Sequence, residues 1–109
     1  FLHLGDTGYT KDFLDIKNKL GSPDLVAIPI GAYKPRTIMK FNHLNPEEAV
    51  KTFIDLRAKK AVAMHWGTFI LSQEKVDAPI KELEINLKKH GIDFEDFFVL
   101  KHGETVNLN

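Results

Sequence analysis

The segment Leu25-Val26-Ala27-Ile28-Pro29-Ile30 decides the fold class of this 109-residue chain. Its apolar residues follow one another without a polar interruption, so both faces of the extended segment are apolar, as in a parallel strand covered on both sides. Pro29 has no N–H to donate, and we expect the strand to lose its pairing there. The segment therefore predicts an α/β fold built on a buried sheet.

Helix signals flank this strand on both sides. On the N-terminal side, Thr10 is a candidate cap for a helix that Gly21 would end. On the C-terminal side, Asn45 is a second candidate cap, with Pro46 in the first turn and Glu48 three residues after the cap. A strand with a helix before and after it is the repeating unit of an α/β fold.

The same alternation continues to the end of the chain. Ala61–Met64 is predicted as a second buried strand, and a helix is expected from Ala78 to His90. The inner side of that helix is expected to carry Ile80, Leu83, Ile85 and Leu87. Phe97–Leu100 and Thr105–Leu108 are predicted as closing strands joined by a turn. With a first strand at Phe1–Leu4, the predicted order is β-α-β-α-β-α-β-β, a mixed sheet with covering helices.

Composition limits the classes of function. Fifteen basic residues balance fifteen acidic residues, so the overall charge gives no reason to expect a nucleic-acid partner. The chain has no cysteine, which excludes disulfides and thiolate metal sites and fits a cytoplasmic protein. Its apolar stretches are far shorter than a membrane helix requires, so no transmembrane segment is expected.

The chain opens with Phe1 inside an apolar run, without an initiating methionine. Domain boundaries normally fall in polar linkers, whereas this run has the pattern of a strand already under way. We therefore interpret the chain as one cut from something longer.

Two polar residues lie just beyond the predicted C-terminal ends of strands, where open α/β sheets bind their ligands. Asp6 follows the first strand within a Gly-rich turn, and His65 follows Ala61–Met64 directly. A carboxylate oxygen and an imidazole nitrogen both suit Zn²⁺. Each residue also has a commoner structural interpretation, because such an aspartate usually forms the turn and such a histidine usually bonds within the protein.

The long loop from Gly31 to Leu44 supplies three further candidates, since a loop of this length is often functional. His43 is expected to contact a substrate phosphate or to donate a proton near neutral pH. Arg36 is a candidate substrate contact, because its planar guanidinium can donate two hydrogen bonds to phosphate oxygens. Tyr33 is a second candidate and lies close to Arg36 in sequence. The alternatives are an exposed loop histidine for His43 and a solvated cation for Arg36.

Five short motifs follow one another in order along essentially the whole chain. They are Gly5-Asp6-Thr7-Gly8-Tyr9, Ile28-Pro29-Ile30-Gly31-Ala32-Tyr33, His43-Leu44-Asn45-Pro46-Glu47-Glu48-Ala49-Val50, His65-Trp66-Gly67-Thr68-Phe69 and Glu95-Asp96-Phe97-Phe98-Val99-Leu100-Lys101-His102-Gly103-Glu104. Together they resemble the N-acylphosphatidylethanolamine-hydrolysing phospholipase D family, a branch of the metallo-β-lactamase superfamily. The resemblance implies that residues 1–109 are the C-terminal half of a four-layer αβ/βα sandwich.

The resemblance also implies roles for the candidate residues. Asp6 would bridge two Zn²⁺ ions at the catalytic centre, and His65 would bind one of them. His43 would act in catalysis on the substrate phosphate or a proton, while Tyr33 and Arg36 would flank the same cleft. The family's His-x-His-x-Asp-His motif belongs to the N-terminal half and is absent here, so this chain alone is expected to bind zinc poorly and not to catalyse.

The function implied for the intact protein is zinc-dependent hydrolysis of a phosphodiester, of phospholipase D type. The substrate would be a small molecule or a phospholipid, and we leave a homodimer open. One alternative is a lactone or carboxylic ester hydrolase of the same fold. The other is a non-enzymatic α/β binding domain, in which Asp6 and His65 are structural. All the enzymatic hypotheses require these two side chains to converge at one edge of the sheet.

Overall fold

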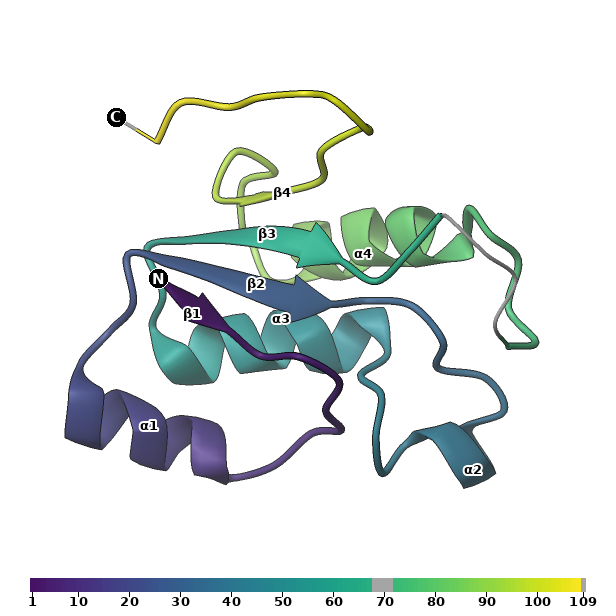
Figure 1. Ribbon diagram of the computed structural model, residues 1–109, viewed down its shortest axis with the longest axis horizontal. Helices are drawn as coiled ribbons and strands as arrows, with labels where there is room; N and C mark the ends of the chain where they lie inside the picture. The colour runs from purple at the N-terminus through teal and green to yellow at the C-terminus, as the bar shows by residue number, and fades with distance from the viewer. Residues whose placement is uncertain (68–71, 109) are drawn as a thin grey trace.

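The computed structural model describes residues 1–67 and 72–108 of the chain. Its strands form one sheet in the order β1-β2-β3-β4, which confirms the α/β fold (Figure 1). The strands are β1 (Leu2–His3), β2 (Leu25–Pro29), β3 (Lys60–Met64) and β4 (Phe97–Phe98). Neighbours pair in parallel throughout, so the C-terminal ends of the described strands meet at one edge.

Helices connect the parallel strands. They are α1 (Asp12–Leu20), α2 (Arg36–Met39), α3 (Pro46–Leu56) and α4 (Ala78–Lys89). Figure 1 shows α3 beneath β2, with α1 and α4 on either side of it. Alternate residues of the strands turn toward these helices and are buried, as Ala61 and Ala63 are in β3. The core therefore lies between one face of the sheet and the three longer helices.

The strand β2 does not lose its pairing at Pro29, contrary to our expectation. The N–H of Ile30 donates to the carbonyl of Met64 at 3.0 Å, so the ladder with β3 continues past the proline. The last hydrogen bond on the β1 side runs from Leu4 N–H to the Ala27 carbonyl, at 3.2 Å. Proline is tolerated because its nitrogen faces the side on which β1 has already ended.

The prediction of a closing strand at residues 105–108 is also wrong, because these residues form no strand. The antiparallel pairing that a mixed sheet requires is therefore not observed among the described residues. The predicted turn is present, closed by the Glu104 N–H on the Lys101 carbonyl at 2.9 Å. Beyond the turn the segment passes over the face of the sheet opposite α3 (Figure 1). There Val106 and Leu108 line a hollow with Phe98, so the segment covers a face and does not extend an edge.

The predicted helices are present, with corrections at the level of single residues. Thr10 lies before the N-cap position of α1, and its hydroxyl accepts from the Asp12 N–H at 3.2 Å. In α4, Leu83 and Leu87 are buried, but Ile85 is 65% exposed. Ile85 lies about 200° around the helix from Leu83, so both cannot face the core.

The loop predicted over residues 31–44 contains the single-turn helix α2. The turn predicted from Gly67 to Ser72 lies mostly outside the described residues. No helix in the described part of the chain is both long enough and apolar enough to cross a membrane.

Candidate metal centre

Three loops leave the C-terminal edge of the sheet, and each brings one potential metal ligand to the same place. Asp6 lies in the loop after β1, His43 at the end of the loop after β2, and His65 directly after β3. One ligand atom from each side chain lies within 4.8 Å of the other two. The expected convergence of Asp6 and His65 is therefore observed, and His43 joins them.

The three side chains make close contacts with one another. The Nε2 atom of His65 lies 3.5 Å from Oδ1 of Asp6. The rings of His43 and His65 are stacked, with centroids 5.5 Å apart. In both histidines Nδ1 is buried and has no hydrogen-bond partner in the described structure. Buried polar atoms are rarely left unpaired, and each such atom calls for an explanation.

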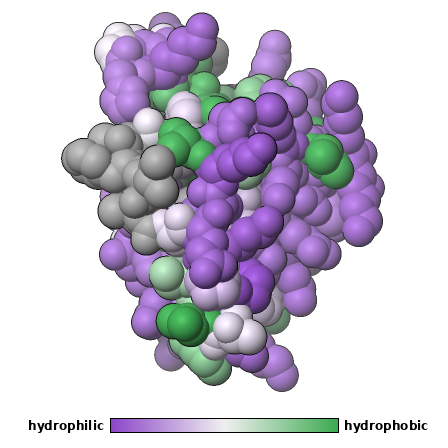
Figure 2. Space-filling model, turned by 90° about the vertical axis from the view of Figure 1, so that its right-hand side faces the viewer, coloured by the Kyte–Doolittle hydropathy of each residue, from purple (hydrophilic) through white to green (hydrophobic). Residues whose placement is uncertain are grey.

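The surface around this edge is mainly hydrophilic and carries only isolated hydrophobic residues (Figure 2). Exposure differs between two of the potential ligands: the side chain of Asp6 is 64% exposed, whereas that of His65 is 25% exposed. The carboxylate therefore faces the outside of this chain, and the imidazole lies against the protein.

The backbone of His65 is in the left-handed conformation, with φ 60°. This conformation is uncommon for residues other than glycine and is found preferentially at functional sites. The loop after β2 packs directly on it: a Cβ at Gly31 would stand 2.0 Å from the His65 carbonyl oxygen. Only glycine fits at position 31, since any side chain would push the two loops apart.

A second glycine holds the first loop against the chain that leads to His43. A Cβ at Gly8 would lie 2.3 Å from the carbonyl oxygen of Lys40 and 2.6 Å from that of Phe41. Gly8 and Gly31 thus set the spacing of the three loops that carry the potential ligands. The sequence showed both glycines within motifs, but not the backbone that each one meets.

Tyr9 anchors the loop of Asp6 to α3. Its hydroxyl donates to the carboxylate of Asp55, and the ammonium of Lys51 lies 4.4 Å from the centre of its ring. The hydrogen bond to Asp55, followed by burial, raises the pKa of Tyr9 to about 12. The phenol therefore stays protonated and keeps its donor role at neutral pH.

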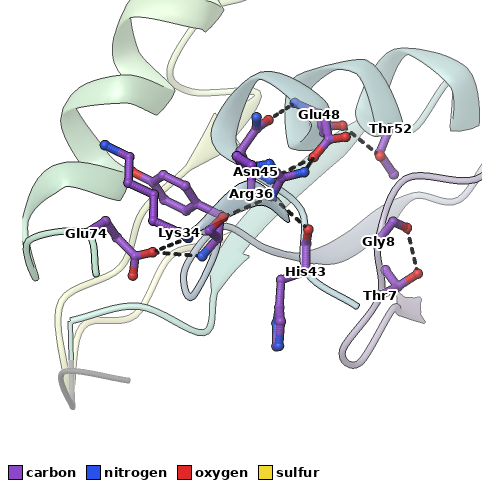
Figure 3. Close-up of polar contacts among 10 residues, drawn as sticks. Thr7, Gly8, Lys34, Arg36, His43, Asn45, Glu48, Thr52 and Glu74 are labelled. Atoms are coloured by element: carbon purple, nitrogen blue, oxygen red, sulfur yellow. Dashed lines mark hydrogen bonds and ion pairs between the residues drawn. The ribbon is translucent and has the colours of Figure 1, made fainter. Parts of the chain in front are cut away.

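Tyr33, a predicted substrate contact, does not join the three potential ligands. Its side chain is buried, and its pKa is raised by burial and by the nearby Glu82 carboxylate of α4. The backbone N–H groups of Tyr33 and Lys34 both donate to Oε1 of Glu74, each at 2.8 Å. Figure 3 shows this carboxylate beside the turn.

Glu74 is a residue that sequence reasoning missed. Burial works against its ionisation, but the Ser72 hydroxyl and the N–H groups of Lys34 and Tyr33 hold its pKa below the ordinary value. The carboxylate ties the segment after His65 to the turn at residues 33–34. Nothing in the local sequence signals this contact, because its partners are about 40 positions away.

Arg36, the other predicted substrate contact, is engaged within the chain. It donates to the carbonyls of Tyr33 and His43, each at 3.2 Å, and pairs with the carboxylate of Glu48 at 2.5 Å. Glu48 also completes the predicted capping box of α3, which is present as expected: the Glu48 N–H donates to Asn45 Oδ1 at 2.8 Å.

Comparison with known proteins agrees with this architecture. A family model described as "Beta-lactamase superfamily domain" matches residues 1–66, a stretch that contains all three potential ligands. The match covers more than half of the 109 residues. The chain belongs to the metallo-β-lactamase superfamily.

Individual relatives narrow the assignment to the N-acylphosphatidylethanolamine-hydrolysing phospholipase D-like branch. The chain is 50% identical over 70 residues to N-acyl-phosphatidylethanolamine-hydrolyzing phospholipase D 1 of Caenorhabditis elegans, a match covering 63% of this chain and 20% of the relative. It is 44% identical over 85 residues to the mitochondrial enzyme of that name from Saccharomyces cerevisiae, covering 76% and 18% respectively.

A more distant relative matches the entire chain. A protein of Nitratidesulfovibrio vulgaris named as a metal-dependent hydrolase is 28% identical over all 109 residues, which make up 40% of its length. The matched part of the chain thus corresponds to about a fifth of the length of each phospholipase relative and to two fifths of this hydrolase.

Proposed function

We propose that the complete protein is a metal-dependent hydrolase that cleaves phosphodiesters, with Asp6 and His65 as metal ligands. The observation that carries the proposal is the 3.5 Å separation of Asp6 Oδ1 and His65 Nε2 at the C-terminal edge of the sheet. This edge is where α/β sheets bind their ligands.

The residues present fit a zinc ion. Two ligand atoms that are each about 2.1 Å from a tetrahedral zinc lie about 3.4 Å apart, close to the distance between the Asp6 and His65 atoms. The donor set, one carboxylate and neutral imidazoles, suits zinc better than magnesium or calcium, which prefer oxygen. The Nδ1 atoms of His43 and His65 have no hydrogen-bond partner among the described residues, so no bond at that atom commits either ring to another group.

A site for two metals needs more donors than the described residues supply here. We therefore propose that further ligands come from a segment outside these 109 residues. When bound, the metals supply Lewis acidity to the phosphoryl oxygens and hydroxide at neutral pH. Asp6 would be a ligand to both ions, and His65 would be a ligand to one of them.

His43 is proposed to handle the substrate phosphate or a proton. Its ring stacks on His65, so it lies next to the proposed ligand without blocking the outward side of Asp6. Imidazole exchanges protons near neutral pH, which suits the protonation of a leaving oxygen. The names of the two phospholipase relatives support a phospholipid as the phosphodiester.

The proposal is tested on the complete protein by metal analysis together with hydrolysis assays. We expect close to two zinc ions per chain and cleavage of bis(p-nitrophenyl) phosphate. Asp6→Ala should abolish the activity and lower the metal content. The matched control is Asp24→Ala, because Asp24 is an exposed carboxylate paired with Lys59 elsewhere on the chain.

Three results decide against the proposal. Unchanged metal content and activity in the Asp6→Ala variant would remove its ligand role. Turnover of a lactone or of p-nitrophenyl acetate, with none of the phosphodiester, would favour an ester hydrolase of the same superfamily. Absence of any bound metal would favour the non-enzymatic alternative.

A further inference from the structure

We infer that Arg36 and Glu48 are positioning residues that fix His43 at the candidate metal centre. The side chain of Arg36 lies between α2, the chain at His43 and the first turn of α3 (Figure 3). Its Nη1 donates to the carbonyls of Tyr33 and His43, each at 3.2 Å, while Nη2 donates to Glu48 Oε1 at 2.5 Å. One guanidinium therefore ties together both ends of the loop after β2.

Glu48 connects this contact to the start of α3. The same Oε1 atom that receives Arg36 also accepts the N–H of Asn45 at 3.1 Å. Asn45 is the N-cap residue and lies two positions after His43. Because one carboxylate serves both partners, the helix cap and the loop arginine hold the short segment 43–45 from two directions.

The ring of His43 depends on this support. The His43 carbonyl faces Arg36, and the imidazole extends away from it on the opposite side (Figure 3). The Nδ1 atom of the ring has no hydrogen-bond partner in the described structure, so no bond at that atom orients the imidazole. The backbone contact and the stacking on His65, with centroids 5.5 Å apart, are what hold it.

The contact needs an arginine. A guanidinium is planar and presents its donors as a fork, so it reaches three acceptors on three segments at once. A lysine would bring the charge but only a single point of contact. The pair is also partly shielded, with side chains 31% and 27% exposed, so it is less screened by solvent than a surface ion pair. These inward contacts assign Arg36 to support of His43 in place of the phosphate contact expected from sequence.

The test uses the complete protein with Arg36→Lys and Glu48→Gln. Arg36→Lys keeps the positive charge but removes the fork of donors. Glu48→Gln keeps the size of the side chain and an oxygen that can accept the Asn45 N–H. The matched control is Lys60→Gln, which breaks a pair of similar exposure, Lys60 with Asp96 at 3.1 Å. That pair joins β3 to the residue before β4 at the opposite end of the strands. Circular dichroism confirms that each variant folds.

The first measurement does not depend on activity. In metal-free protein, the ring resonances of His43 are assigned by their loss in a His43→Ala variant. We expect Arg36→Lys to move them, because the stacking on His65 changes, whereas Lys60→Gln leaves them in place. Unchanged His43 resonances in folded Arg36→Lys protein would overturn the inference.

The second measurement rests on the proposed function and separates kcat from KM for bis(p-nitrophenyl) phosphate. We expect Arg36→Lys to lower kcat about tenfold through misplacement of His43, with KM within about twofold. In the His43→Ala background the same change should have less than about a twofold effect, because residues that act through one another are not additive. A large rise in KM at unchanged kcat would instead show direct substrate contact. If no variant and no parent cleaves the phosphodiester, the proposed function fails, and the resonances still decide the positioning role.

Discussion

Gly31 lies against the carbonyl of His65 so closely that a Cβ at position 31 would be 2.0 Å from the oxygen. The contact joins the loop after β2 to a residue whose own backbone is left-handed. Since both partners are backbone, neither side can move aside as a flexible side chain would. The spacing between the loop of His43 and the proposed ligand His65 is therefore fixed by the absence of a side chain.

The first prediction concerns Gly31→Ala. We expect a loss of about 1–3 kcal/mol in the free energy of unfolding, the usual cost of forcing extra atoms into a packed site. Metal content should fall as well, because the added methyl displaces His65. Urea denaturation and metal analysis of the complete protein measure the two effects.

A matched control is available at Gly91, which ends α4. Its φ is +67° and nothing lies within 4 Å of an added Cβ, so Gly91→Ala carries conformational strain without a clash. The free energy of unfolding should fall by about 1 kcal/mol, while metal content stays unchanged. Equal metal loss in the two variants would contradict the steric account of Gly31.

The second prediction concerns the capping box of α3. Asn45→Ala removes the side-chain acceptor of the Glu48 N–H, and we expect a loss of about 1 kcal/mol in stability. Asn45→Asp retains the acceptor and should stay within about 0.5 kcal/mol of the parent. Thermal or urea unfolding of the three proteins checks both values, and equal stabilities would contradict the capping role.

This cap also shows which parts of the structure follow from sequence. Asn45, Pro46 and Glu48 specify the start of α3 because the interacting groups are within three residues of one another. The meeting of Asp6 with His65 could be expected for a different reason. Both follow strands, and parallel strands end at a common edge.

Other features could not be predicted because they depend on packing between distant segments. The clash that excludes a side chain at Gly31 exists only once β2 and β3 are paired. From the sequence, Arg36 could be interpreted as a solvated loop cation. Its contacts with the His43 carbonyl and the Glu48 carboxylate are known only from the folded structure. The course of residues 105–108 was missed since their alternation fits an edge strand and a segment lying on a sheet face equally well.

The third prediction compares two apolar residues of α4. Leu83 is fully buried, so Leu83→Ala should lower the free energy of unfolding by about 2–5 kcal/mol. Ile85 is 65% exposed, and Ile85→Ala should change it by about 0.5 kcal/mol or less. Denaturant unfolding of both variants gives the comparison. A similar loss at both positions would mean that a partner covers the outer side of α4 in the complete protein.

The last prediction concerns Tyr9 and alkaline pH. The pKa of Tyr9 is raised from 10.0 to about 12, first by the hydrogen bond to Asp55 and then by burial. A group with a raised pKa in the folded state contributes stability that is complete below its unfolded pKa and is lost as the pH rises through its folded pKa. The Tyr9 contribution should therefore be present below pH 10 and disappear toward pH 12.

The variant that isolates this contribution is Tyr9→Phe. It keeps the ring beneath Lys51 but removes the hydroxyl that donates to Asp55. At pH 8 the variant should be about 1 kcal/mol less stable than the parent, the net value of one hydrogen bond. Urea unfolding at intervals from pH 8 to pH 12 should show the two proteins converging, because only the parent loses this bond. A difference that stays constant over the whole range would show that Tyr9 has the same pKa in the folded and unfolded states, and it would contradict the hydrogen bond to Asp55 as the cause of a raised pKa.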